Sequence, residues 1–357
     1  MLKKFLFGFG FIAIILTIIP FLPFDFWWIR MFDFPHVQLT VLTAIALLFF
    51  TYKFNFKSIK DYSFVTLLSL CFLFQVSKIY PYTVFSSYKI LESSDNQKET
   101  IKILTANVLQ KNNNFNLLID EIQSLKPDVL LLTEVNQEWI NRLKNVTQSN
   151  FSNSEIYPLD NAYGIALYSK YPLINTETKF LVADTIPSIH TKLILKSGDT
   201  IQLYAIHPTP PILMENKTST DRDAEMMMIA KKSMEQKLPV IVCGDFNDVA
   251  WSKTSRVFER VSQLLDPRKG RGTYNTYSAK SFLWKWPLDH IFVSSEFRIK
   301  ELEIANSIKS DHYPLYTEFT FEPDVKQEQQ APKVSDEDLK FANEQIENFL
   351  EEKRKNN

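Results

Sequence analysis

The sequence predicts a layered α/β or α+β domain that is preceded by about three transmembrane helices. Phe, Leu, Ile and Thr dominate the first 85 of the 357 residues, whereas the remainder mixes charged and apolar residues as soluble folds do. Beyond residue 100, short β-rich runs alternate with amphipathic helical patterns. One chain therefore combines a membrane region with a folded domain.

Three apolar runs define the membrane region, over residues 5–24, 34–52 and 62–80. The first holds twenty uncharged residues, enough for a helix to cross the ~30 Å hydrocarbon core. The third reaches residue 80 only if Lys78 snorkels and Tyr80 lies at the interface. A cleaved signal peptide fits the first run poorly, because Pro-Phe-Asp-Phe-Trp-Trp follows it instead of a small-residue cleavage site. Three buried core helices would need more polar residues than these runs hold.

The lysines indicate how this region is oriented. Lys3 and Lys4 precede the first run, and Lys53, Lys57 and Lys60 lie between the second and the third. The positive-inside rule places both segments in the cytoplasm. Three crossings then put the folded domain on the extracytoplasmic side of the cell membrane. Without the third span the domain is cytoplasmic.

Charge and cysteine content exclude two classes of protein. A formal net charge of -1 excludes a strongly basic protein that coats nucleic acid, although a local basic patch is compatible with it. The two cysteines, Cys71 and Cys243, both lie in apolar runs, which argues against a disulfide framework and a thiolate metal site. Cysteine usage leaves the compartment open.

We divide the chain into a membrane region (1–85), a polar linker (86–100), a folded domain (101–321) and a charged tail (322–357). The domain shows no internal repeat or low-complexity tract. Its clearest helices span residues 115–125 and 221–237. The strand patterns are residues 101–108, 129–133, 165–168, 201–206 and 240–243.

The tail begins as a linker and then predicts an amphipathic helix. Ser335 and Asp338 form a capping-box pattern at its start. A narrow apolar stripe follows. We expect this helix to dock on its own domain or to be solvated, because two heptads are too few to indicate a coiled coil. The stripe consists of Leu339, Ala342, Ile346 and Phe349.

Polar residues follow four of the predicted strands. They are Asn107, Glu134, His207 and Asp245. Ligands of open sheets bind beyond the carboxyl ends of strands, so these side chains are expected to converge on one crevice. Two Asp-His pairs, 289–290 and 311–312, follow downstream. Carboxylate and amide oxygens suit Mg²⁺ or Mn²⁺ better than zinc, which takes more His or Cys ligands.

The same motifs resemble the endonuclease/exonuclease/phosphatase superfamily, which includes pancreatic deoxyribonuclease, abasic-site endonucleases, neutral sphingomyelinases and inositol polyphosphate 5-phosphatases. Six motifs in the order of that family make coincidence improbable. The resemblance implies a four-layer sandwich of two β-sheets flanked by helices. The motifs are Thr-Ala-Asn-Val (105–108), Leu-Leu-Thr-Glu-Val (131–135), Gly-Ile-Ala-Leu-Tyr-Ser-Lys-Tyr-Pro (164–172), Gly-Asp-Phe-Asn-Asp (244–248), Leu-Asp-His-Ile-Phe-Val-Ser (288–294) and Ser-Asp-His-Tyr-Pro-Leu (310–315).

The resemblance also implies a metal site. Glu134 would be the principal metal carboxylate, and Asn107 and Asp311 would complete or position the cation. Leu109 stands where some family nucleases carry a second acidic residue, which argues against a second metal position.

Five further residues would carry catalysis by the same resemblance. Asp245 would orient or deprotonate the attacking water, and Asn247 would hold the phosphate or the nucleophile. His312, steered by Asp289, would stabilise charge on the phosphoryl oxygens, and His207 would contact the phosphate or protonate the leaving group. This division of labour is physically sensible, because a phosphodiester repels hydroxide until its charge is neutralised.

Some of these residues have a purely structural interpretation beside the functional one. Asn107 is also compatible with a turn, Glu134 with a cap of the helix from Asn136, and His207 with a loop-ordering role before Pro-Thr-Pro-Pro. That proline-rich loop also replaces the Leu of many family nucleases. His290 should face away from the site, because its neighbour points inward and strand side chains alternate.

Residues 268–286 interleave basic and aromatic side chains and bear on the substrate. Basic groups with stacking aromatics suit nucleic acid, Trp, Tyr and Lys also suit a membrane interface, and the aromatic residues alone could pack a sheet edge. The candidates for substrate binding are Arg268, Lys269, Arg271, Tyr274, Trp284 and Trp286.

The sequence thus favours a membrane-anchored, Mg²⁺- or Mn²⁺-dependent phosphodiesterase, with nuclease activity ahead of a lipid phosphodiesterase or phosphatase. Its partners would be the lipid bilayer and a phosphodiester substrate, either DNA or a phospholipid headgroup, and no protein partner is inferred. A catalytically silent membrane scaffold is the alternative from a different class. The intact set of candidate catalytic residues argues against it.

Overall fold

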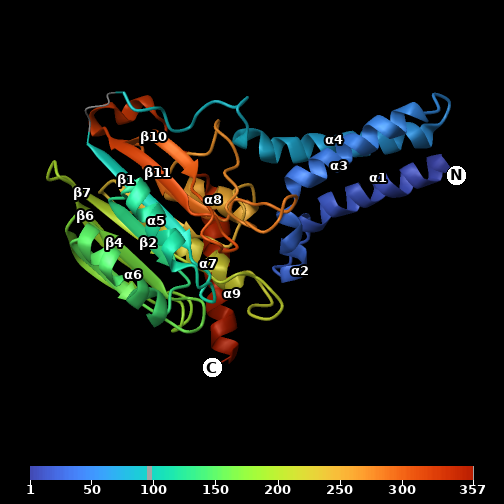
Figure 1. Ribbon diagram of the computed structural model, residues 1–357. Coiled ribbons are helices and arrows are strands. Elements are labelled where there is room, and N and C mark those ends of the chain that lie inside the picture. Colours follow the sequence, from blue (N-terminus) through green and yellow to red (C-terminus); the bar gives the residue numbers. More distant parts are fainter. Residues whose placement is uncertain (95–98, 357) are drawn as a thin grey trace.

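The computed structural model describes residues 1–94 and 99–356. In the described part of the domain, the strands form two sheets with the orders β10-β11-β1-β2-β4-β3 and β5-β6-β7-β8-β9. Figure 1 shows both sheets beside a helical bundle that projects away from them. The strands are β1 (Thr100–Asn107), β2 (Val129–Thr133), β3 (Asn153–Tyr157), β4 (Ile165–Ser169), β5 (Leu173–Lys179), β6 (Ser188–Ile194), β7 (Thr200–Ile206), β8 (Val240–Asp245), β9 (Asp289–Val293), β10 (Phe297–Ile304) and β11 (Leu315–Phe321).

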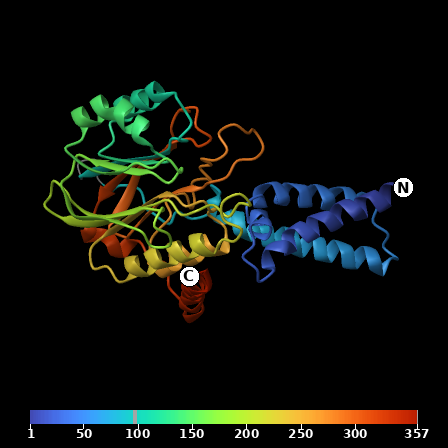
Figure 2. The same ribbon diagram turned by 90° about the horizontal axis from the view of Figure 1, so that it is seen from below.

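Helices cover the outer face of each sheet, as Figure 2 shows from below. Those on the first sheet are α5 (Phe115–Leu125) and α6 (Gln137–Asn150). Those on the second are α7 (Thr220–Met234), α8 (Lys253–Ser262) and α9 (Asp336–Asn356). The layers are therefore helix, sheet, sheet and helix, which confirms the predicted fold class.

The alternation of side chains along a strand explains why β2, which is buried on both faces, is apolar along almost its whole length. In β2, Val129 and Leu131 point into the core between the sheets, whereas Leu130 and Leu132 pack against α5 and α6. A strand that is buried on both faces keeps apolar residues at every position. Its first polar side chain then appears where the strand ends.

The membrane region forms three helices that pack against one another. They are α1 (Leu2–Ile18), α3 (His36–Tyr52) and α4 (Ile59–Ile79). Many of their Phe, Leu and Ile side chains point outward, as a helix in lipid requires. Two segments, 2–21 and 59–82, are long and apolar enough to cross a membrane, and a third exists if the bent pair 27–33 and 36–52 is one span.

The helix limits correct two of the predicted spans. The helix of the run over 62–80 begins earlier than predicted, at Ile59, because Ser58 caps it by accepting a hydrogen bond from the Asp61 N–H. The run over 34–52 is shorter than predicted, since the helix begins after Pro35. The connection between α1 and α3 is not a plain loop. It contains η1 (Ile19–Phe21), α2 (Trp27–Arg30) and η2 (Met31–Asp33).

The predicted linker is partly docked on the domain. Ile90 is fully buried in the core between the sheets, and Leu91 and Ser93 exchange backbone hydrogen bonds with Ile299 of β10. The rest of the predicted linker includes residues 95–98, which lie outside the described residues. The start of the tail is docked too, because the Gln329 side chain bonds the backbone of Leu91 and Phe297.

The C-terminal helix lies on its own domain, as favoured from the sequence. Ala342 and Phe349 are buried among residues of α7 and α8 or their neighbours. The capping box is formed, because the Ser335 hydroxyl accepts from the Asp338 N–H while the Asp338 carboxylate accepts from the Ser335 N–H. The apolar stripe is therefore the contact surface of α9.

Candidate active site

Four strand ends from two sheets meet at one place. β1 and β2 are parallel neighbours in the first sheet, and β7 and β8 are parallel neighbours in the second. Because the sheets face each other, Asn107 at the end of β1 reaches both neighbouring carboxylates. Its amide nitrogen donates to Glu134 at 2.8 Å and to Asp245 at 3.0 Å. The predicted convergence of these strand ends is thus observed.

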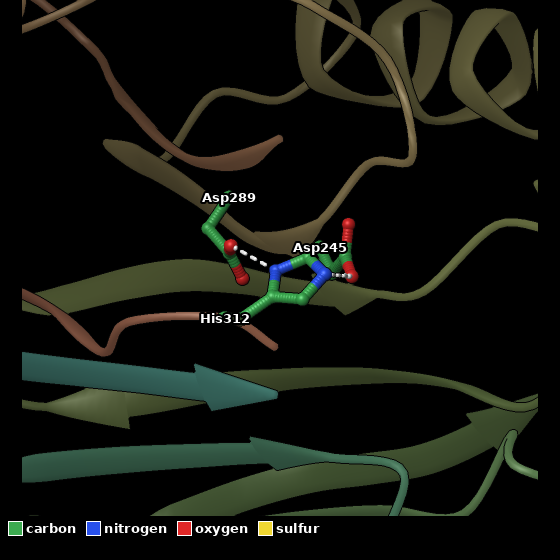
Figure 3. Close-up of side chains that lie close together, drawn as sticks. All are labelled: Asp245, Asp289 and His312. Carbon is green, nitrogen blue, oxygen red and sulfur yellow. Dashed lines mark hydrogen bonds and ion pairs between the residues drawn. The ribbon is translucent and has the colours of Figure 1, made fainter. Parts of the chain in front are cut away.

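A buried histidine lies between two aspartates beside this bridge (Figure 3). His312 Nδ1 lies 2.7 Å from Asp289 Oδ2, and its Nε2 lies 3.6 Å from Asp245 Oδ2. All three residues are almost completely buried. Asp289 begins β9 and His312 precedes β11, so two sheets contribute to this array.

The charges of this array favour ionised groups. Burial opposes the imidazolium form of His312, but Asp245, Asp289 and Asp311 outweigh that effect and raise its pKa to about 10. Burial likewise opposes the carboxylate of Asp245. The neighbouring His312 and His207 rings and the bonds from Asn107 and Asn247 nevertheless lower the pKa of Asp245 below its ordinary value. A cationic ring therefore faces an anionic carboxylate.

Glu134 is held at the edge of the site by backbone geometry. It follows β2 with a φ of 60°, and its carboxylate accepts from the Asn107 amide and lies 3.4 Å from the Gln110 N–H. Burial raises its pKa above the ordinary value. Asn136, not Glu134, caps the following helix by accepting from the Trp139 N–H, so the capping interpretation of Glu134 is wrong.

His207 and Asn247 complete the polar set. His207 Nε2 lies 3.8 Å from Asp245 Oδ2, and its Nδ1 is buried without a hydrogen-bond partner among the described residues. The Asn247 amide donates to the Pro208 carbonyl at 2.8 Å, and its backbone N–H donates to Asp245 at 3.0 Å. The unpartnered Nδ1 is not the nitrogen that faces Asp245, and a buried nitrogen of this kind needs a hydrogen-bond partner such as a ligand or an ordered water.

A cavity of about 490 Å³ opens onto these groups. The predicted site residues that line it are Glu134, His207, Asp245, Asn247, Trp286, Asp311 and His312. Asn107 and Asp289 are buried behind the lining and contact it through their hydrogen bonds. His290 is fully buried and lies within 2.9 Å of the Asp248 carbonyl, away from the cavity as expected.

The cavity also contains residues that the motifs did not indicate. Tyr163 donates to Glu215 at 2.5 Å, and Tyr277 lies with its ring centre 5.0 Å from that of His312. Trp27, Met31 and Phe34 come from the connection between α1 and α3. Tyr163 directly precedes the motif 164–172, so the sequence could have indicated it as a site residue. No sequence pattern indicates the other residues, because their position in the cavity depends on how distant segments pack.

Most of the predicted substrate-binding residues of the segment 268–286 do not face the cavity. Arg268 is fully buried, pairs with Asp266 at 2.8 Å and lies beside His290, so its assignment to substrate is wrong. Lys269 pairs with Glu259, and the Arg271 guanidinium donates to the Ile90 carbonyl at 2.9 Å. Tyr274 packs against the core. Trp286 lines the cavity, and Trp284 is exposed beside it with the ring centres 6.1 Å apart.

The donor chemistry fits a hard divalent cation. Glu134 and Asp311 bring carboxylate oxygens to one cavity, and such oxygens are what Mg²⁺ takes from proteins. The Asn107 oxygen accepts from the Leu109 N–H at 3.0 Å, so its amide bridges the carboxylates and positions them. Asp245, Asp289 and His312 also offer ligand atoms within 4.8 Å of one another, but the hydrogen bond between Asp289 and His312 already satisfies two of them.

Comparisons with known proteins agree with this geometry. A model described as "Endonuclease/Exonuclease/phosphatase family" matches residues 104–312. No curated protein sequence matches the chain. The similar solved structures have low sequence identity to this chain, so their similarity shows a shared fold.

Three solved structures illustrate that likeness. The catalytic domain of human nocturnin, solved with a bound sulfate, has 20% identity and a TM-score of 0.52, and the match covers 68% of this chain and 99% of that one. A humanized TDP2 of D. rerio has 16% identity and a TM-score of 0.51, with 62% and 99% covered. An endonuclease/exonuclease/phosphatase of Bacteroides vulgatus has 18% identity and a TM-score of 0.51, with 63% and 100% covered.

Proposed function

The chain belongs to the endonuclease/exonuclease/phosphatase family, and on that premise we propose that it is a membrane-anchored hydrolase of phosphoester bonds that depends on a divalent metal ion. Members of this family are hydrolases that act on such bonds. The observation that carries the proposal is the buried array in which His312 lies between Asp289 and Asp245, beside the Glu134 carboxylate.

Glu134 and Asp311 are the proposed ligands of the metal ion, and Asn107 holds Glu134 in place. Mg²⁺ or Mn²⁺ bound there would supply positive charge to the phosphoryl oxygens. Burial is the largest cause that raises the pKa of Glu134, and it outweighs the lowering effects of His207, His312 and the bond from Asn107.

The remaining residues handle the water and the charge of the substrate. Asp245 accepts a hydrogen bond from the attacking water and orients it toward phosphorus, and its lowered pKa keeps it ionised. His312 carries its positive charge next to the phosphoryl oxygens. His207 offers its unpartnered Nδ1 to the phosphate or the leaving oxygen. Asn247 positions Asp245, and thereby the attacking water, through the hydrogen bond from its backbone N–H.

The structure of the segment 268–286 reduces the support for a nuclease. A nucleic-acid backbone is held by exposed cations, but Arg268 and Lys269 pair with acidic residues inside the domain. The D. rerio TDP2 has been solved with a single-stranded DNA product, which keeps DNA as the alternative substrate. We therefore propose the hydrolase without assigning it to nucleotides.

We also propose that the domain lies on the extracytoplasmic side of the membrane. Lys3 pairs with Asp61, which places the starts of α1 and α4 side by side at the end of the bundle away from the domain (Figure 1). The lysines between α3 and α4 are at that same end. The positive-inside rule puts this end in the cytoplasm.

The metal requirement provides the test. We expect the full-length protein in detergent to hydrolyse methyl 4-nitrophenyl phosphate with Mg²⁺ or Mn²⁺, and EDTA to abolish release of 4-nitrophenol. Glu134→Gln should lower kcat/KM by about 100-fold or more, because several kcal/mol of charge stabilisation are lost. It should also weaken Mg²⁺ binding measured by calorimetry.

Glu138→Gln is the matched control, since Glu138 is exposed on α6 and its ion pair among the described residues is with the exposed Arg142. It should leave both kcat/KM and Mg²⁺ affinity unchanged. Turnover that resists EDTA would contradict the metal site. No turnover of this diester, of 4-nitrophenyl phosphate or of DNA would favour the silent membrane scaffold.

A further inference from the structure

We propose that the connection between α1 and α3 forms the wall of the active site that binds an apolar part of the substrate, and that this substrate is a membrane lipid carrying a phosphoester. This inference rests on the proposed function and names its substrate class. It assigns substrate-binding roles to Trp27, Met31 and Phe34, which belong to the membrane region and not to the hydrolase domain.

The wall is in continuous contact with the catalytic residues. Phe34 packs edge-on against Trp286 with ring centres 5.5 Å apart. Trp286 stacks on Tyr277 at 6.1 Å, and Tyr277 lies 5.0 Å from the ring of His312. An apolar surface thus leads from the membrane region to the group that would bind the phosphoryl oxygens.

Hydrogen bonds fix this wall to the domain. The Trp27 N–H donates to the Lys217 carbonyl at 2.9 Å. The Trp251 indole donates to the Asp33 carbonyl at 2.9 Å. Bonds at both ends of the segment between α1 and α3 give it a defined position on the domain, as a preformed binding wall needs.

Exposed apolar side chains lie close in sequence to the cavity-lining residues Trp27, Ile212 and Trp286, and we call them the apolar rim. It consists of three segments with exposed apolar side chains: residues 24–28 of the membrane region, 212–214 after β7 and 282–284 before β9. In Figure 1 the yellow loop after β7 and the orange loops before β9 lie on the side of the domain from which α1, α3 and α4 project. The rim residues are Phe24, Phe26, Trp28, Ile212, Leu213, Met214, Phe282, Leu283 and Trp284.

The rim continues into the helices, which identifies the bilayer as its partner. Gln38 near the start of α3 donates to the Leu283 carbonyl at 2.7 Å, and Phe26 pairs with Thr218 in a short antiparallel bridge. An exposed apolar patch marks a membrane or protein contact. Here it borders segments that are themselves apolar enough to span a membrane, and Trp and Phe are residues that favour the interface.

The cavity lining favours a lipid over a nucleic acid. Among the described residues, no Lys or Arg lines it, whereas Glu134, Glu215, Asp245 and Asp311 do. A polyanion that runs through such a cavity would find no Lys or Arg along its path, and the positive charge of His312 compensates only the phosphate at the reacting position. A lipid needs charge compensation at one phosphate only, and its chain gains contact with the apolar wall.

Two phosphodiesters that differ only in chain length test the proposal. Methyl and hexadecyl 4-nitrophenyl phosphate react identically, since water adds to phosphorus and the P–O bond to 4-nitrophenolate breaks. The protein is the full chain in phosphatidylcholine nanodiscs. We expect kcat/KM to be at least about tenfold higher for the hexadecyl diester, because apolar contacts contribute this much discrimination or more.

Variants separate binding at the wall from simple partitioning into the disc. Met31→Ser and Trp27→Ala should each lower the hexadecyl-to-methyl ratio of kcat/KM by about tenfold, although neither changes how the chain partitions. Met31 is 49% exposed, so its substitution is compatible with folding. Phe56→Ala is the control, because Phe56 is 80% exposed between α3 and α4 at the far end of the bundle.

The outcomes distinguish this inference from the function on which it rests. A ratio near one in the unaltered protein, or a ratio that neither wall variant changes, would overturn the lipid assignment while the hydrolase stands. Faster cleavage of a single-stranded DNA oligonucleotide than of the hexadecyl diester would overturn it in favour of nucleic acid. Failure to hydrolyse any of the three with Mg²⁺ would instead refute the proposed function.

Discussion

At the scale of single residues, His312 and Asp289 form the most informative pair. Asp289 is buried behind the cavity lining and contacts the site through the 2.7 Å bond to His312 Nδ1. That bond orients the ring so that Nδ1 faces Asp289. The other nitrogen, Nε2, then faces Asp245 and the cavity where the phosphate would bind. Asp289 is therefore a positioning residue, which acts through His312.

Replacing Asp289 with Asn should expose this role. The folded-state pKa of His312 is raised to about 10, partly by Asp289, so the imidazolium persists until the pH rises toward that value. Without the carboxylate the pKa falls, and the alkaline limb of the kcat/KM profile should move to lower pH. We expect a loss of about 10- to 100-fold at neutral pH.

A pH–rate series on the full-length protein measures this effect. Asp324→Asn, an exposed aspartate after β11, is the matched control and should leave the profile in place. A lower rate with an unmoved alkaline limb would mean that Asp289 supports the fold and not the charge of His312.

At the scale of elements, α9 shows how local and tertiary interactions combine. Asp338 closes the capping box with Ser335 and also accepts two hydrogen bonds from the Arg260 guanidinium of α8, at 2.9 and 2.6 Å. The bonds from Arg260 are the largest cause that lowers the pKa of Asp338 to about 2. One side chain thus begins the helix and attaches it to the domain.

Asp338→Asn should therefore destabilise the protein by about 1 kcal/mol, which corresponds to a melting temperature about 2–4 °C lower for a domain of this size. Because the folded-state pKa is depressed, this contribution is present above the unfolded pKa of about 4 and is lost as the pH falls toward 2. Thermal unfolding followed by tryptophan fluorescence should show that the difference in melting temperature between the variant and the unaltered protein becomes smaller below pH 4.

Glu344→Gln is the control within the same helix, since Glu344 is exposed and, in the described part of the chain, pairs with the exposed Lys340 at 3.8 Å. Its melting temperature should match that of the unaltered protein. An equal loss in both variants would indicate a general effect of charge on α9.

At the scale of the whole molecule, hydrogen bonds join the helical bundle of residues 1–85 to the domain. The Tyr82 hydroxyl at the end of the bundle donates to the Ala250 carbonyl at 2.8 Å, and Trp251 bonds the segment before α3. These contacts place the cavity on the bundle side of the domain. The active site would therefore lie near the bilayer surface.

The orientation of the bundle and the domain is open to a labelling test. Cys71 and Cys243 are both buried, so the unaltered protein should react little with a thiol reagent. Ser197→Cys, in the exposed turn between β6 and β7, should react with a membrane-impermeant maleimide in intact cells, because the domain is proposed to be extracytoplasmic. Lys57→Cys, between α3 and α4, should react only after the cells are lysed.

Lysis provides the control for both positions, since each cysteine should then label fully. Labelling of Lys57→Cys but not of Ser197→Cys in intact cells would reverse the orientation. It would also place the substrate in the cytoplasmic leaflet.

The sequence by itself determined the two-part organisation, the fold class and the polar residues at strand ends. These features are local: β2 and β8 are buried on both faces and are apolar almost until they end, and Asn107, Glu134, His207 and Asp245 are polar residues at or after the ends of four strands. Their order along the chain was sufficient to indicate the family. The spacing of residues also predicted α5 at its observed limits.

Only the tertiary structure decided which distant segments meet at the site. Arg268 and Trp286 belong to one basic and aromatic segment, yet Arg268 is buried against Asp266 and Trp286 lines the cavity. Phe34 touches Trp286 across more than half the chain. No local pattern encodes such contacts, because they depend on how the membrane bundle packs on the sheets and on which side chains that packing leaves exposed.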